Sequence, residues 1–511
     1  MGLKELDLLF IHPPAILGES HSILGADVAY SHQFVSFPMG FFSMSNNLET
    51  AGFNVKIINL GERMLVKKSE ETLEDLVLNV FSEYSPKIVG IDIHWWVHSA
   101  GAVETARLIK RHCPRTKIFV GGITASLYVD EILNNYEYID YITFGECEES
   151  IVEFIKEICK EAPCLSEVPN LAYRNGDTIL KTSVQIPNIE NGSVDVTRYD
   201  LLADKPIVNP DRALIPIERG CTQKCCYCGA SKKSFEFIMH RPKMCMLNPH
   251  NVVDMIKKNM ENGRRKIYLY GDIRDGGREY VNTFFKLLNE SQITKIHIVI
   301  ELFYPPSEEY IRNWKVWAEN TGNTIEATFS PESANEKVRL HVGKNYSNEV
   351  MLDSCKLVIE SGIPVSIYFM LGFPEETNET VEQTLQLSEK IVEMYAARFK
   401  KEDLRHEIVG YEFMQMPDPG SSVHLDPDKY GYTLHFRGFE GLVNMVNSAK
   451  HWSELVGYST AYFTKDELVE KYYYIKERIY KIYKKFNLIS DEDFNENMKI
   501  LKEDRSYLCK V

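Results

Sequence analysis

The sequence predicts an α/β protein in which a doubly wound parallel sheet precedes a partial (β/α)6 TIM-type barrel and a helical C-terminal region. Three observations support this fold class. Short apolar runs alternate with amphipathic segments through residues 1–162, a proline-rich stretch then interrupts the alternation, and a second series of six runs begins at residue 213. Such alternation is typical of parallel strands joined by crossover helices. A chain of 511 residues also exceeds one ordinary core, so we expect several domains.

Residues 1–162 are expected to form the first domain. Its predicted strands are Leu6–Ile11, Asn54–Ile58, Lys87–Ile93, Lys117–Val120 and Tyr138–Thr143. Its predicted helices are Met39–Thr50, Leu73–Tyr84, Ala100–His112 behind a Ser99 cap, and Glu148–Cys159. Five strands with helices between them predict a Rossmann-like, doubly wound sheet.

Residues 163–212 are expected to connect this domain to the next. Prolines at positions 163, 169, 187, 206 and 210 break the periodicity, and Asn191–Gly192 favours a turn. We therefore expect a connector that contains only a few short strands.

Residues 213–427 are predicted to form the barrel. Its six expected strands are Ala213–Glu218, Lys266–Tyr270, Lys295–Ile300, Thr324–Phe329, Pro364–Met370 and Glu407–Phe413. Asn248 is expected to cap a helix that has Pro249 at its first position. In barrels of this type the chemistry lies in the loops that leave the carboxyl ends of the strands.

Residues 428–511 are predicted to be helical and rich in aromatic residues. The tyrosines of Val469–Phe486 could cap the barrel mouth, but core packing is the favoured interpretation.

Composition excludes some functional classes. The sequence contains no run of eighteen apolar residues and no basic leader followed by an apolar segment, so we expect neither a membrane span nor secretion, and a cytoplasmic location follows. The net charge is −15 and no basic stripe is present. A protein that grips long nucleic acid must displace phosphate counterions and usually has the opposite charge. We therefore expect no long nucleic acid as partner.

Four of the eleven cysteines lie between Cys221 and Cys228. Such crowding in a reducing compartment indicates metal binding and not a disulfide. Cys221, Cys225 and Cys228, spaced by four and three residues, can bind three irons of a [4Fe–4S] cluster and leave the fourth iron open. The alternative is structural zinc, which needs a fourth ligand, and only Cys245 or His240 lies nearby. The position of the loop after the first barrel strand favours the cluster.

The pattern Cys221-x3-Cys225-x2-Cys228, with Tyr227 before the last cysteine, resembles the signature of the radical S-adenosylmethionine (SAM) superfamily over about residues 206–425. The resemblance implies that SAM binds the open iron and is split by one electron into a 5′-deoxyadenosyl radical. It further implies SAM contacts at strand ends, namely Tyr227, Gly271, Asp272, Glu301, Ser330 and Gly372. In the last of these turns, Glu375 replaces the family's second glycine, so we expect no positive φ at that position.

A Rossmann-like domain ahead of this barrel resembles the cobalamin-binding branch of the superfamily. The resemblance implies cobalamin contacts after the third, fourth and fifth strands, namely Trp95, Trp96, Gly121, Gly122, Thr124, Gly145 and Glu146. Trp95 and Trp96 either pack beneath the corrin or fill the domain interface. No Asp-x-His-x-x-Gly motif follows the first strand, so we expect no lower histidine ligand from that motif.

By resemblance, the protein is expected to be a cobalamin-dependent methyltransferase that acts on an unactivated carbon through the 5′-deoxyadenosyl radical. Three alternatives remain open. In the first, the radical drives a rearrangement, a cyclisation or another reaction without methyl transfer. In the second, cobalamin has another role or has been lost from the front domain. In the third, the protein is a non-catalytic cofactor carrier. The expected partners are a substrate that the sequence does not identify and an electron donor such as flavodoxin or ferredoxin.

Overall fold

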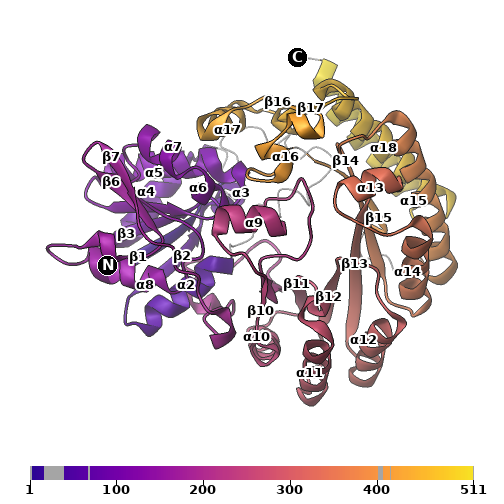
Figure 1. The fold of residues 1–511 in the computed structure, drawn as a ribbon, viewed down its shortest axis with the longest axis horizontal. Helices are drawn as coiled ribbons and strands as arrows, with labels where there is room; N and C mark the ends of the chain where they lie inside the picture. The colour runs from indigo at the N-terminus through magenta and orange to yellow at the C-terminus, as the bar shows by residue number, and fades with distance from the viewer. Residues whose placement is uncertain (1–2, 16–38, 67–69, 401–406, 415, 510–511) are drawn as a thin grey trace.

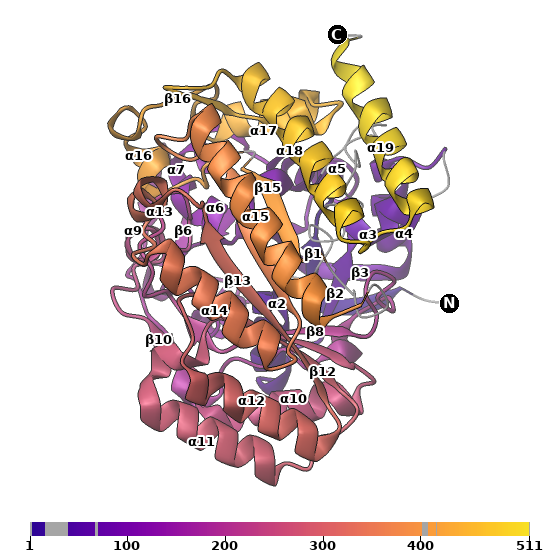
Figure 2. The same ribbon diagram turned by 90° about the vertical axis from the view of Figure 1, so that its right-hand side faces the viewer.

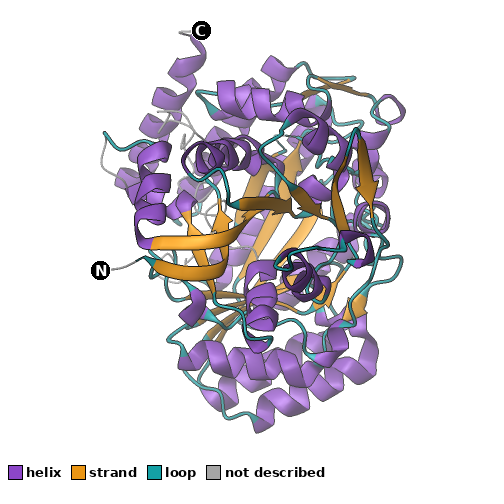
Figure 3. Cartoon of the chain, turned by 90° about the vertical axis from the view of Figure 1, so that its left-hand side faces the viewer, coloured by secondary structure: helices purple, strands orange, loops and turns teal. Residues whose placement is uncertain are grey.

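The computed structural model describes residues 3–15, 39–66, 70–400, 407–414 and 416–509. Two α/β units lie side by side, and the C-terminal region spans their upper edges and continues down the outside of the second unit (Figure 1). Strands occupy the interior and helices surround them (Figure 3). No helix in these ranges is long and apolar enough to cross a membrane.

The first unit is a seven-stranded sheet of order β2-β1-β3-β4-β5-β6-β7. Its parallel part consists of β1 (Lys4–His12), β2 (Val55–Asn59), β3 (Tyr84–Asp92), β4 (Lys117–Gly121) and β5 (Tyr141–Thr143). The predicted parallel sheet is therefore confirmed. The expected connector departs from a simple linker, because β6 (Leu171–Asn175) and β7 (Thr178–Lys181) extend the sheet in antiparallel fashion.

Helices cover both faces of this sheet. On one face α2 (Met39–Thr50) contacts α8 (Ser150–Ile158), while on the other α4 (Leu73–Glu83) contacts α3 (Leu60–Val66) and α5 (Ser99–His112) (Figure 1). Two short helices, α6 (Ile123–Leu127) and α7 (Val129–Asn135), follow β4. The helices after β1 and β3 thus lie on opposite faces, which opens a ligand-binding crevice at the carboxyl ends of these two strands.

The expected Ser99 cap is wrong. Ser99 is the first residue of α5, and the preceding His98 makes no side-chain cap hydrogen bond. A 3-10 turn, Trp96–His98, runs directly into the helix, so the chain is already helical before the serine is reached.

The second unit has six parallel strands that neighbour one another in chain order, as predicted for a partial (β/α)6 barrel. They are β8 (Arg212–Pro216), β11 (Lys266–Tyr270), β12 (His297–Leu302), β13 (Thr324–Glu332), β14 (Val365–Leu371) and β15 (Val409–Phe413). The outer layer consists of α10 (Pro249–Glu261), α11 (Gly277–Glu290), α12 (Glu308–Thr321), α14 (Asn348–Glu360) and α15 (Asn378–Arg398) (Figure 2). The Asn248 cap with Pro249 at the first helical position is confirmed.

The first barrel strand is shorter than predicted. It ends at Pro216, and Glu218–Arg219 forms a separate strand, β9, that pairs antiparallel with β10 (Cys245–Met246). The Ile217 N–H still donates to the Tyr270 carbonyl at 3.1 Å, whereas the Ile217 carbonyl accepts the Leu247 N–H at 2.8 Å, so the chain turns from β11 towards β10 at this residue. This change of direction places the cysteine loop between the two units, followed by α9 (Lys232–Met239).

The C-terminal region is more varied than the predicted helices. After α16 (Ser422–Leu425), strands β16 (Tyr432–Leu434) and β17 (Tyr458–Thr460) form a small antiparallel pair on either side of α17 (Gly438–Ser448). Two long helices follow, α18 (Lys465–Lys485) and α19 (Asp491–Arg505).

The α18 tyrosines support the core-packing interpretation. Tyr472, Tyr473 and Tyr483 are buried. The Tyr483 hydroxyl accepts a hydrogen bond from the Val409 N–H at 2.9 Å and donates one to its carbonyl at 3.0 Å, which ties α18 to β15.

Candidate functional site

The three predicted cluster ligands lie in a loop held at the carboxyl end of the barrel. Cys221 and Cys228 are half-buried and Cys225 is buried. The Gln223 N–H donates to Cys221 Sγ and the Ala230 N–H donates to Cys228 Sγ, each at 3.3 Å. Burial raises the pKa of Cys221 to about 12 and that of Cys228 above its usual range, and Cys225 adds to both shifts. The cysteine loop therefore suits a cationic metal centre, which would stabilise the thiolate form of the three cysteines.

Neither residue considered as a fourth zinc ligand is directed at these thiols. The Cys245 thiol contacts Glu190 at 3.7 Å, and His240 is an exposed residue with a φ of 57° at the end of α9. Among the residues described, no three His, Cys, Asp or Glu side chains are already gathered as a metal site. Three soft donors on one loop fit a [4Fe–4S] cluster, in which each thiolate binds a different iron.

Segments that follow other strands clamp the cysteine loop. Asp418, after β15, accepts a hydrogen bond from the Gly229 N–H at 3.0 Å and donates its own N–H to the Tyr227 carbonyl at 3.0 Å. Gly343, after α13 (Glu336–His341), lies so close that a Cβ there would be 2.8 Å from the Lys224 carbonyl. The loop geometry is thus fixed by residues distant in sequence.

Tyr227 and two residues absent from the sequence prediction form a polar group beside Cys225. The Tyr227 hydroxyl donates to Glu332 at 2.7 Å, and its ring packs on Phe373 with the centroids 4.9 Å apart. Glu332 is buried with a φ of 71°, a strained conformation for a residue with a side chain. Lys344 is only 5% exposed, yet its pKa is raised because the charges of Cys225, Glu332 and the other two cysteines outweigh its burial.

The predicted SAM contacts at the ends of β11 and β12 differ in their hydrogen-bond partners and in their exposure. The Gly271 N–H donates to Glu301 at 2.7 Å, and the Tyr268 hydroxyl donates to the other Glu301 oxygen at 2.9 Å. The Asp272 carboxylate is fully buried and binds Arg274 and the Phe303 N–H. The Asp272 carboxylate therefore stabilises the loops after β11 and β12, whereas Glu301 holds the end of β11 through Gly271 and Tyr268.

Glu218 is an acidic residue of this group that the motif comparison did not assign. A Cβ on Gly271 would lie 2.9 Å from its carboxyl carbon, and its Oε2 is buried without a hydrogen-bond partner in the described part of the chain. Burial and the neighbouring carboxylates of Asp275, Asp272 and Glu301 raise its pKa to about 9. An arriving ammonium group would satisfy this oxygen, so the site fits the amino group of SAM. Its position three residues before Cys221 was the available sequence signal.

The remaining predicted SAM contacts lie at the ends of β13 and β14. Ser330 is half-buried in β13. Gly372 has a φ of 106°, and a Cβ there would be 1.8 Å from the Tyr458 hydroxyl. The expectation for Glu375 is wrong, because its φ is 61°. Glu376 explains why this turn is held: it is fully buried and accepts the Gly372 N–H at 2.6 Å.

At the carboxyl edge of the first sheet, histidines and an aspartate gather where β1 and β3 end. His12 Nδ1 lies 3.3 Å from Asp92 Oδ2, and the His12 and His98 rings are 4.6 Å apart. Trp95 is 39% exposed and stacks on His98 with centroids 6.3 Å apart, whereas Trp96 is buried. An exposed indole at the crevice between β1 and β3 offers an apolar face of the kind a flat corrin ring can cover, so this edge fits cobalamin.

The predicted glycines lie one and two strands further along this edge. A Cβ on Gly122 would be 2.7 Å from the His94 backbone, and one on Gly121 would be 2.6 Å from the Thr143 hydroxyl. Thr124 donates its hydroxyl to the His94 carbonyl at 3.0 Å, and the Gly145 N–H donates to Ser126 at 3.0 Å. These residues bring the ends of β3, β4 and β5 close together, which is a packing role that the sequence alone did not reveal.

Glu146 binds the second unit. Its carboxylate pairs with Arg241 at 2.5 Å and lies 3.9 Å from Arg219, whose guanidinium pairs with Glu148 at 2.6 Å. All four side chains are largely buried, and Arg219 precedes Cys221 by two residues. This network joins the loop after β5 to the cysteine loop.

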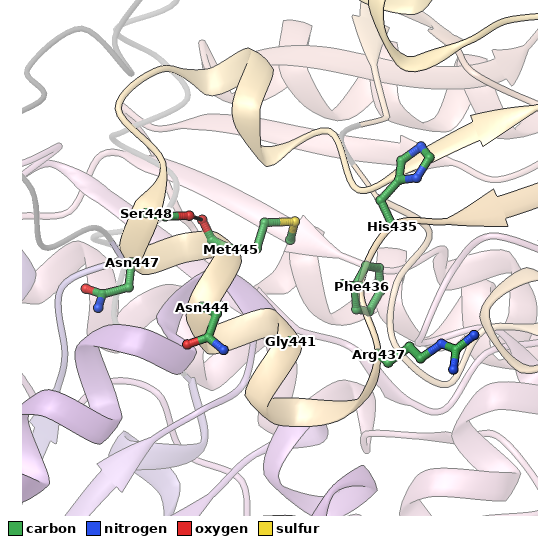
Figure 4. Close-up of a pocket in the computed structure, with 8 residues that line it drawn as sticks. All are labelled: His435, Phe436, Arg437, Gly441, Asn444, Met445, Asn447 and Ser448. Atoms are coloured by element: carbon green, nitrogen blue, oxygen red, sulfur yellow. Dashed lines mark hydrogen bonds between the residues drawn. The ribbon is translucent and has the colours of Figure 1, made fainter.

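Two hollows in the described structure lie apart from these residues. An open hollow of about 610 Å³ on the C-terminal region is lined by His435, Phe436, Arg437 and the exposed side of α17 (Figure 4). A second of about 330 Å³ lies at the amino-terminal ends of β12, β13 and β14, opposite the cysteines. Neither contains a predicted site residue.

The fold and site together define a metal-cluster enzyme whose Rossmann-like cofactor domain faces a partial barrel. Comparison with protein families gives the same two parts, because the B12 binding domain model matches residues 25–155 and the radical SAM superfamily model matches residues 215–388. The chain therefore contains a B12 binding domain followed by a radical SAM domain. These domains imply a [4Fe–4S] cluster, SAM and cobalamin as cofactors.

The chain is also similar to known proteins in sequence and in fold. The chain is 24% identical over 407 residues to a tRNA-2-methylthio-N(6)-dimethylallyladenosine synthase of Aliarcobacter butzleri, covering 73% of this chain and 82% of the relative. Its fold is similar to that of the radical SAM methyltransferase TsrM of Kitasatospora setae, with a TM-score of 0.63, 12% identity and coverage of 99% and 100%. It is also similar to the cobalamin-dependent radical enzyme OxsB, with a TM-score of 0.63, 15% identity and coverage of 99% and 71%.

Proposed function

We propose that this cobalamin-dependent radical SAM enzyme is a methyltransferase that methylates an unactivated carbon of its substrate. The observation that carries the proposal is the position of the cysteine loop, which lies between the barrel mouth and the carboxyl edge of the first sheet and is bound to both. Arg219 ties it to Glu148 of the first unit, and Glu218 packs on Gly271 of the barrel. When bound, the cluster, SAM and cobalamin supply a 5′-deoxyadenosyl radical and a transferable methyl group.

The chain's own residues hold and orient these groups. Cys221, Cys225 and Cys228 ligate the cluster, Glu218 receives the ammonium of SAM, and Lys344 places a buried positive charge beside the thiolates. Among the SAM contacts expected from sequence we retain Tyr227, Gly271, Glu301, Ser330 and Gly372, and we assign Asp272 to wall support. At the first sheet we retain Trp95 as a cobalamin contact. Supporting roles fall to Trp96, Gly121, Gly122, Thr124, Gly145 and Glu146.

We propose domain boundaries at 1–181, 182–212, 213–427 and 428–511. The first differs from the sequence-based boundary at 162 because β6 and β7 complete the first sheet.

The methylthiotransferase relative raises RNA as a second class of substrate, and the charge of this chain disfavours it. A net charge of −15 opposes the accumulation of phosphates at its surface. We propose a small molecule or peptide substrate in the cytoplasm, where free thiols persist, with flavodoxin or ferredoxin as electron donor.

The test is anaerobic incubation of the reconstituted protein with SAM and dithionite, followed by product analysis. Methyl transfer predicts both S-adenosylhomocysteine and 5′-deoxyadenosine. If only 5′-deoxyadenosine forms, the reaction is a non-methylating rearrangement or cyclisation. If cofactors bind and neither product forms, the protein is a carrier.

Two neighbouring cysteines provide a matched pair of variants for the cluster assignment. Cys225→Ala should abolish the iron content and the brown colour, while Cys226→Ala should keep both, because Cys226 is buried beside the ligand without being one. A full cluster in Cys225→Ala would refute the ligand set.

A further inference from the structure

Exposed lysines lie within the cysteine loop and in the segments that pack beside it, although the protein as a whole is acidic. Residues 219–243 contain a single acidic residue, Glu236, and six basic residues, Arg219, Lys224, Lys232, Lys233, Arg241 and Lys243, although the net charge of the chain is −15. Arg219 and Arg241 are paired with Glu148 and Glu146. The four lysines are exposed and have no ion pair with any residue whose placement is described. We call these four residues the lysine frame.

Helix α9 holds two of these lysines next to the loop. Its inner face, Phe235, Ile238 and Met239, packs on Ile123 and Leu127 of the first unit. Its outer face presents Lys233, Glu236 and Phe237, and Phe237 is 53% exposed. In Figure 1, α9 lies between the two units with the loop beside it. One face of α9 is therefore packed against the first unit, and the opposite face is exposed.

The other two lysines border the same loop. The Lys232 N–H donates to the Gln223 carbonyl at 2.9 Å, which places the start of α9 beside Lys224. A Cβ on Gly220 would lie 3.2 Å from Met244 Cα, so the segment with Lys243 runs against the loop on its other side. Thr222, next to Cys221, and Ala230, two residues after Cys228, are exposed. The loop thus reaches the surface close to these lysines, and the nearest carboxylate on the barrel side is Asp275, which accepts the Thr222 hydroxyl at 2.8 Å.

We propose that the lysine frame and Phe237 form the docking surface for an acidic electron-carrier protein. This inference rests on the proposed function, which needs a one-electron reductant at the cluster. Upon docking, the reduced carrier loses one electron and the oxidised cluster gains it, with no atom transferred. Complementary charge steers encounter and fixes orientation, and unpaired lysines need not break internal ion pairs first. An exposed aromatic side chain adds apolar contact area at the centre of such a surface.

RNA is the other polyanion that such a surface could attract. The frame is compact, and Glu236 lies within it, whereas binding to a long nucleic acid neutralises many phosphates along an extended basic surface. These features favour a small acidic protein over RNA.

The test is the anaerobic rate at which a reduced acidic flavodoxin reduces the cluster. The variant Lys232→Glu/Lys233→Glu/Lys243→Glu removes three charges of the frame without touching the cysteines or their sequence neighbours. Lys205→Glu/Lys286→Glu/Lys502→Glu is the matched control, because it changes the net charge equally at exposed lysines elsewhere. We expect about a tenfold slower rate at low salt in the frame variant alone, and loss of the salt dependence that the wild type shows.

Dithionite reduction separates docking from cluster chemistry. A frame variant that flavodoxin reduces as fast as the control would overturn the proposal. So would a variant that dithionite also reduces slowly, because the lysines would then serve the cluster itself. Loss of tRNA affinity with an unchanged flavodoxin rate would assign the surface to RNA. Failure of the proposed function is distinct, since wild-type protein would then form no S-adenosylhomocysteine even with dithionite.

Discussion

Replacing Arg219 by methionine should destabilise the protein more than an ordinary surface change. Arg219 is the only cation paired with the Glu148 carboxylate in the described structure, at 2.6 Å, and the Glu148 side chain is 6% exposed. Removal of one partner from a buried pair leaves an uncompensated charge and costs about 3–5 kcal/mol. By contrast, the Lys4–Glu83 pair has side chains 63% and 46% exposed, so solvent screens it and Lys4→Met should destabilise the protein far less than Arg219→Met.

The assay is urea unfolding of the apo protein, so that cofactor loading does not enter. Trp95 and Trp96 report on the first unit, while Trp314 and Trp317 report on the barrel. Because the network joins the two units, Arg219→Met should separate their transitions as well as lower the stability.

A double-mutant cycle with Glu148→Gln isolates the pair. The double variant should be less destabilised than the sum of the single variants, by about 1–3 kcal/mol, since neutral glutamine no longer needs the guanidinium. If Arg219→Met costs no more than Lys4→Met, or if the cycle shows no coupling, the network does not join the units and the argument for it fails.

Three further predictions follow from single residues. Lys344→Met should lower the midpoint potential of the reconstituted cluster by on the order of tens of millivolts, because a buried positive charge favours the reduced form. Potentiometric titration would measure this shift. Lys344→Arg, which keeps the charge, should retain the wild-type potential. Gly372→Ala should cost about 2–5 kcal/mol through a clash with the Tyr458 hydroxyl and a φ of 106°, whereas Gly176→Ala, at positive φ in open space, should cost about 1 kcal/mol. Burial raises the pKa of Glu376 from 4.5 to about 7. The folded state therefore binds more protons between these values, stability falls as pH rises through that window, and Glu376→Gln should flatten this part of the melting-temperature profile; an unchanged slope would contradict the assignment.

Sequence periodicity predicted the architecture closely because the barrel sheet and the first five strands of the other sheet are parallel. Buried strands such as β11 (Lys266–Tyr270) and β4 (Lys117–Gly121) are apolar runs between helical segments, and that pattern is local. The errors lie where local signals are weak. The β6–β7 hairpin consists of two short strands of five and four residues. The end of the first barrel strand at Pro216 depends on pairing of the following residues with β10, almost thirty residues later.

The sequence predicted only those site residues that lie within one loop or in a recognisable motif. Cys221, Cys225 and Cys228 are recognisable by spacing, and glycines at strand ends are visible in sequence. Glu332 reaches the loop from the end of β13 and Lys344 from the segment after α13, and no spacing rule connects them to Cys225. Glu146 illustrates the opposite case: its position after β5 suggested a cofactor contact, but a buried carboxylate takes the nearest cation, which is Arg241.

The short segment from Glu218 to Gly229 contacts the first unit and both the beginning and the end of the barrel. Within it, Arg219 binds the first unit, Glu218 packs on the second barrel strand and Gly229 is held by Asp418 after the last. Each contact constrains the same loop from a different direction, so a shift in any one unit moves the thiols relative to the other two. The proposed methyl transfer requires two cofactors to act on one substrate, so their supports need to be fixed to within a fraction of an ångström. A loop bound by the first sheet and by both ends of the barrel meets that requirement.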